Sequence, residues 1–80
     1  MKKQLDNAIK RLNKKYPKLE VQKYTLYNGA FLFFAVPKGF KGMPMDPYYL
    51  VDLEEGIVGP FAPAFDFEGF AKAADNFKEI

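Results

Sequence analysis

The sequence predicts a small α+β domain in which a four-stranded antiparallel sheet carries two helices, in the order αββββα. Three features of the chain predict this fold: an amphipathic segment at each end, an Asn-Gly pair between two β-rich runs, and two more such runs around a Glu-Glu-Gly turn. The 80 residues suffice for one domain, residues 1–80. We expect both helices to pack on one face of the sheet, which leaves the other face partly open with tyrosines on it.

Residues 3–16 are predicted to form the first helix. Five apolar side chains follow the i, i+3, i+4, i+7 spacing and share one side of it: Leu5, Ala8, Ile9, Leu12 and Tyr16. Lys10 and Lys14 fall on the opposite side. Pro17 ends the helix, because the residue before a proline is pushed out of the α-helical region.

The centre of the fold is a β-hairpin around Asn28-Gly29, since a type I′ turn needs positive φ at both central residues. The register that follows pairs Leu26 with Phe31, Thr25 with Leu32, Tyr24 with Phe33 and Lys23 with Phe34. The apolar residues of the first strand change parity between Val21 and Tyr24, which predicts a β-bulge there. The second strand, residues 30–36, is apolar on both faces and is therefore expected in the middle of the sheet. These patterns do not fix the strand order.

Residues 37–47 form a loop, because its three prolines and two glycines exclude a regular element. Whether this loop is functional or only a crossover stays open. Residues 48–53 and 57–61 are predicted to form a second hairpin, with Gly56 in the left-handed conformation.

Asp66 is the predicted N-cap of a final helix that runs to about Lys78. Its apolar stripe is predicted to be Phe67, Phe70, Ala71, Ala74 and Phe77. Gly69 lowers helix propensity but lets the helix approach the sheet closely.

The composition argues against catalysis. The chain has no histidine, cysteine or serine, so it has neither the usual nucleophile and base pairs nor the usual zinc ligands. The acidic residues show no calcium-loop spacing, and no phosphate-binding or dinucleotide motif is present. We therefore expect no enzyme activity, no cofactor and no metal.

Charge divides the chain into two parts. Residues 1–18 carry seven basic side chains against Asp6, a net charge of +6, whereas residues 19–80 carry five basic against nine acidic ones, a net charge of −4. This asymmetry has two interpretations: solvated faces of opposite sign on the two helices, or a surface for a nucleic acid or an acidic partner. For the second interpretation the binding residues would be Lys3, Lys10, Arg11, Lys14 and Lys15.

Aromatic content favours a different function. Nine phenylalanines and five tyrosines are more than two helices and one sheet face require, and aromatic residues are enriched at protein interfaces. We expect a non-catalytic protein-interaction or regulatory module, and self-association is one form that this interaction can take. The candidate interaction residues are Tyr24, Tyr27, Phe40, Met43, Tyr48 and Tyr49.

No apolar run approaches the roughly 20 residues of a membrane span. No apolar segment follows the charged start of the chain either, so we expect no secretion signal and a cytoplasmic protein.

Overall fold

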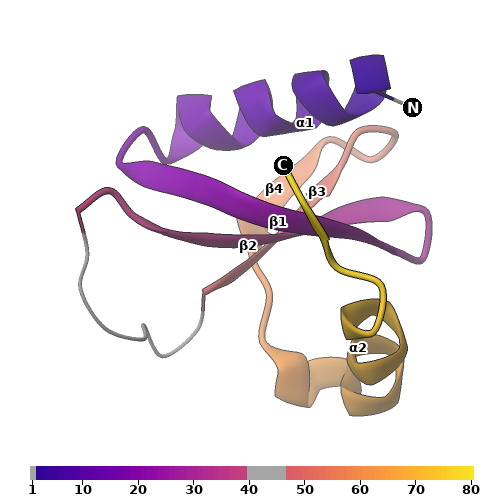
Figure 1. The fold of residues 1–80 in the computed structure, drawn as a ribbon. Coiled ribbons are helices and arrows are strands. Elements are labelled where there is room, and N and C mark those ends of the chain that lie inside the picture. The colour runs from indigo at the N-terminus through magenta and orange to yellow at the C-terminus, as the bar shows by residue number, and fades with distance from the viewer. Residues whose placement is uncertain (1, 40–46) are drawn as a thin grey trace.

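The computed structural model describes residues 2–39 and 47–80, in which a twisted antiparallel sheet lies between two helices (Figure 1). The elements are α1 (Lys2–Lys15), β1 (Leu19–Tyr27), β2 (Ala30–Pro37), β3 (Tyr48–Asp52), β4 (Ile57–Pro60), the 3₁₀ helix η1 (Pro63–Asp66), α2 (Phe67–Ala74) and β5 (Lys78–Glu79). The strand order is β4-β3-β2-β1-β5, with every neighbouring pair antiparallel. The α+β class is confirmed, but the sheet has five strands in place of the predicted four.

The central hairpin forms as the sequence predicts. Asn28 and Gly29 both have positive φ, +50° and +81°, so the turn is compatible with the right-handed twist of its strands. All four predicted cross-strand pairs are present, from Leu26 with Phe31 to Lys23 with Phe34. The register shifts between Val21 and Lys23, which locates the predicted bulge. The prediction for Gly56 is also confirmed, since its φ is +69°.

One face of the sheet is covered by α1. Ala8 and Leu12 of the helix pack on Phe33 of β2 and Val51 of β3, and these side chains belong to the larger core. Leu12, Phe33 and Val51 are fully buried. Burial of one such side chain contributes roughly 1.5–3 kcal/mol, so this layer is the main source of stability.

The opposite face is covered by α2, and the prediction that both helices share one face is wrong. Leu32 is fully buried there, with Phe61 and Ala73 against it. In Figure 1, α1 and α2 lie on opposite sides of the sheet. The physical reason is the composition of β2: it presents Leu32 and Phe34 on one face and Phe31 and Phe33 on the other, so both faces need a cover.

The final helix is shorter than predicted. It ends at Ala74, and the chain then turns through hydrogen bonds from Asn76 N to Ala73 O (3.0 Å) and from Phe77 N to Ala74 O (3.4 Å). This turn brings Lys78 and Glu79 beside β1 as the fifth strand.

Candidate functional site

The predicted interaction tyrosines are divided between the two faces of the sheet. Tyr24 and Tyr49 are half-buried on the α1 side, where the ring of Tyr49 lies 5.3 Å from that of Tyr16. Tyr27 and Tyr48 are half-buried on the α2 side. The open sheet face expected to present tyrosines is therefore absent from the described part of the chain.

The α2 side is an aromatic cluster. The ring of Tyr48 meets Phe70 edge-on at 4.8 Å and Phe34 at 5.8 Å, and Tyr27 meets Phe61 at 4.9 Å. Edge-to-face pairs of this kind contribute about 0.5–1.5 kcal/mol beyond their buried area. The packing gives these tyrosines a structural role. Phe40 and Met43, the other two candidates, lie outside the described residues.

Tyr27 also anchors the start of α2. Its hydroxyl donates to Asp66 Oδ2 at 2.5 Å, and Asp66 Oδ1 accepts from Gly69 N at 3.1 Å, which confirms the predicted N-cap. A Cβ on Gly69 would press against the carboxylate of Asp66 and lie 3.1 Å from Cε1 of Tyr27. The prediction that Gly69 permits a close approach to the sheet is confirmed. The missing side chain leaves room for the Asp66 carboxylate and for the ring of Tyr27 on β1.

This hydrogen-bond network does not favour acid–base catalysis. The bond from Tyr27, followed by the Gly69 N–H, lowers the pKa of Asp66 below its ordinary value of 3.8. The same bond, with lesser contributions from desolvation and the charge of Asp66, raises the pKa of Tyr27 above 10.0. A general acid or base works best with a pKa near the pH at which the protein operates. The pKa values of Asp66 and Tyr27 both move away from pH 7.

Among the described residues, the most exposed aromatic side chains lie on either side of Asp66. Phe65 is 88% exposed and Phe67 is 71% exposed, on η1 and at the start of α2. Most large apolar side chains of the described residues are buried or half-buried, so two exposed phenylalanines separated by a single residue need an explanation. We call these two residues the aromatic patch.

Sequence reasoning missed the aromatic patch because it placed the buried side of α2 incorrectly. The helix docks through Ala73, whose carbonyl oxygen accepts a bond of 2.8 Å from the buried hydroxyl of Thr25. At 3.6 residues per turn, Phe67 lies about 90° from the midpoint between Phe70 and Ala73, at the margin of the docked side. Thr25 is the only threonine, and a buried polar group of this kind requires a partner; this could have indicated which side of α2 docks.

The five basic candidates all lie on α1 with exposed side chains. Lys3, Lys10 and Lys14 fall within about 40° of one another around the helix axis, on the side away from the sheet. Arg11 flanks them. Lys15 differs, because its ammonium group donates to Val58 O at 2.6 Å and lies 5.7 Å from the centre of the Tyr16 ring.

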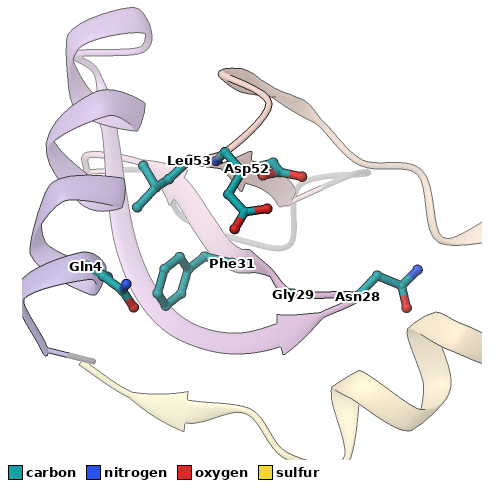
Figure 2. A pocket seen from close by; sticks show the side chains of 7 residues that line it. Gln4, Asn28, Gly29, Phe31, Asp52 and Leu53 are labelled. Carbon is teal, nitrogen blue, oxygen red and sulfur yellow. Dashed lines mark hydrogen bonds between the residues drawn. The ribbon is translucent and has the colours of Figure 1, made fainter.

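A small polar cavity lies where α1, the β1–β2 turn and the β3–β4 turn meet (Figure 2). Its volume is about 190 Å³, below the roughly 300 Å³ at which ligand pockets begin. Asp52, one of its lining residues, accepts hydrogen bonds from the N–H groups of Glu54 (3.0 Å) and Glu55 (3.2 Å). That carboxylate closes the β3–β4 turn, so it is already engaged within the fold.

Among residues 2–39 and 47–80, no group of three or more acidic side chains could hold a metal ion. Over the same residues, no helix combines the length and the apolar character needed to cross a membrane.

Comparisons with protein-family models, with curated proteins and with solved structures find no match for this chain.

Proposed function

We propose that the chain is a non-catalytic interaction module that binds another protein through its aromatic patch. The observation that carries this proposal is the exposure of Phe65 and Phe67 in a domain whose other phenylalanines, among the described residues, are buried or half-buried. Aromatic anchors at the centre of a contact dominate the energy of many protein interfaces. Leaving two in water without a partner would give up stabilisation that a small domain needs.

The size of the patch indicates what kind of contact it makes. A phenylalanine can bury about 150–250 Å², so the two exposed rings present roughly 300 Å² of apolar surface. At about 25 cal/mol per Å² this gives about 7 kcal/mol before costs, whereas association costs about 4–15 kcal/mol. The patch is therefore an anchor within a wider interface, since stable contacts bury about 800 Å² per partner.

A paired-variant capture experiment tests this function. The double variant Phe65→Ser/Phe67→Ser should keep its fold, because both side chains are largely in water, and should lose the protein retained by the immobilised wild-type chain. The matched control is Ile57→Ser, which changes an exposed apolar residue elsewhere, on the β3–β4 hairpin. Equal retention by the double variant and the wild type would refute the proposal.

The outer side of α1 supports a second candidate function, nucleic-acid binding. Four exposed cations, Lys3, Lys10, Arg11 and Lys14, follow one side of a rigid helix over about 16 Å. The apolar side of α1 is buried on the sheet, so this outer surface would meet a partner through its charged and polar side chains. Contacts of this type neutralise phosphates and do not read bases.

Salt dependence distinguishes this function from a merely solvated helix. Four cations that neutralise about four phosphates give a slope of about −3.6 in log affinity against log salt concentration on a mixed-sequence duplex. Lys10→Glu/Lys14→Glu should reduce the slope to about −1.8 or abolish binding. Lys23→Glu/Lys72→Glu makes the same change in net charge at exposed sites outside α1 and should preserve binding. Equal affinity for all three proteins would rule out a role for α1.

A further inference from the structure

The two edges of the sheet are protected in different ways. On β4, Val58 O accepts a hydrogen bond of 2.6 Å from Lys15 Nζ, and Pro60 has no N–H to offer. Lysine and proline are common means of preventing an edge strand from pairing with another chain. The β4 edge is therefore blocked within the fold.

In the described part of the chain, β5 is the strand that lies along the β1 edge. This two-residue strand pairs with Lys23 and Tyr24, and Ile80 N adds one hydrogen bond of 3.2 Å to Gln22 O. Both β5 residues are exposed, and Ile80 is 57% exposed. β1 has nine residues, so most of its outer edge has no strand beside it.

Apolar surface borders this edge on both sides of Tyr24. A cavity of about 450 Å³ lies between α1 and the β1–β5 pair. Its apolar lining is Leu5, Ile9, Tyr24 and Ile80, and the charged residues Lys2, Asp6 and Glu79 complete it. A second cavity of about 330 Å³ is lined by Tyr24 and Leu26, which is 45% exposed, and by the polar residues Thr25, Asn76 and Lys78. Alternate residues of an antiparallel strand direct their N–H and C=O groups to the same side, so Leu26 presents its backbone groups outward as Tyr24 does.

We propose that β5 is a detachable cover and that, when it leaves, β1 pairs with β1 of a second copy of this chain. The β1 edge is the one that becomes free to pair, because the β4 edge stays blocked. Assembly therefore ends at two copies, as in a closed two-fold dimer. In an antiparallel β1–β1 pair both α1 helices lie on the same side of the joined sheet. The apolar surfaces beside Tyr24 in the two copies then face each other.

This surface is separate from the aromatic patch, so the two proposals stand or fall independently. Dimerisation requires β5 to leave β1 in both copies. The apparent dimer affinity therefore varies with the square of the open fraction, the fraction of molecules in which β5 has left β1. One net backbone hydrogen bond changes that fraction about fivefold. Removing one such bond between β1 and β5 should therefore strengthen the dimer about 25-fold.

A disulfide across β1 and β5 tests the proposal, because the chain has no cysteine of its own. Lys23 and Glu79 face each other directly and both are exposed. Opposed residues of antiparallel strands have Cα atoms about 4.5–5.5 Å apart, within the range of a disulfide. In Lys23→Cys/Glu79→Cys, oxidation should fix β5 in place and abolish dimer formation in sedimentation equilibrium. Reduction of the same protein should restore it.

Lys78→Pro provides the opposite perturbation, since it removes the N–H of the β5 residue that pairs with Tyr24. It should dimerise at lower concentration than the wild type, by about 25-fold in affinity. Dimerisation of the oxidised double-cysteine variant equal to that of its reduced form would overturn the proposal. So would a Lys78→Pro protein that remains monomeric. Phe65→Ser/Phe67→Ser should leave the dimer unchanged, which separates this result from the function of the aromatic patch.

Discussion

Replacing Leu12 with alanine tests the energetic importance of the α1 layer. Leu12 is fully buried between α1 and the sheet, in the cluster that contains Phe33 and Val51. Such a change removes the transfer free energy of the side chain and leaves a cavity, at a cost of about 2–5 kcal/mol. A chain of this length has a total stability of about 4–12 kcal/mol. A loss near 3 kcal/mol would thus lower the Tm by about 12–24 °C.

Urea unfolding of Leu12→Ala, with Leu26→Ala as the control, measures this effect. Leu26 loses the same atoms but is 45% exposed, so we expect a cost of only about 1 kcal/mol. The m-values should match that of the wild type, because the surface exposed on unfolding hardly changes. Equal losses at the two positions would refute the view that burial of Leu12 in the α1 layer stabilises the fold.

Three further predictions concern backbone and pH. Gly69→Ala should destabilise the protein despite the gain in helix propensity of about 1 kcal/mol, because its Cβ would disturb the contact between Asp66 and Tyr27; a higher urea midpoint would contradict this. Gly29→Ala, at φ +81°, should cost about 1 kcal/mol or more, whereas Gly59→Ala, which has open space, should change the unfolding free energy by less than about 0.5 kcal/mol. The contribution of ionised Asp66 to the free energy of unfolding should be complete above pH 3.8 and be lost as the pH falls through the lowered pKa of Asp66 in the folded state. The contribution of neutral Tyr27 should be complete below pH 10.0 and be lost as the pH rises through the raised pKa of Tyr27 in the folded state. Tyr27→Phe should therefore flatten both limbs of the stability–pH profile, and a profile parallel to that of the wild type would show that the bond is unimportant.

Local patterns predicted the central hairpin well. The Asn28-Gly29 turn fixes which residues of β1 and β2 face each other, because a two-residue turn leaves no freedom in register. The change of apolar parity along β1 likewise indicated the bulge before Lys23. Both features depend on residues close together in the chain.

The placement of the helices depends on contacts between distant residues and was predicted incorrectly. The apolar character of both faces of β2 indicated a central strand, and it also required a cover on each side, which only the structure made evident. The strand β5 has no apolar alternation and only two residues, so no pattern in the sequence could identify it.

The candidate site was predicted only in part. The exposed basic side of α1 follows directly from helical periodicity, and its binding function stays a prediction. The aromatic patch was missed, because the exposure of Phe67 depends on which side of an eight-residue helix docks. The docked side of α2 is fixed by a tertiary contact, the hydrogen bond from the Thr25 hydroxyl to Ala73 O.

The most direct test of the proposed function is photo-cross-linking from position 65 in cells that make the protein. A benzoylphenylalanine in place of Phe65 retains an aromatic side chain at the patch, and the same residue at the exposed Asn13 of α1 serves as the control. The account predicts a discrete protein adduct from position 65 that disappears when Phe67→Ser is added, and no such adduct from position 13. An adduct that persists in the Phe67→Ser background, or the absence of any adduct from position 65, would contradict it.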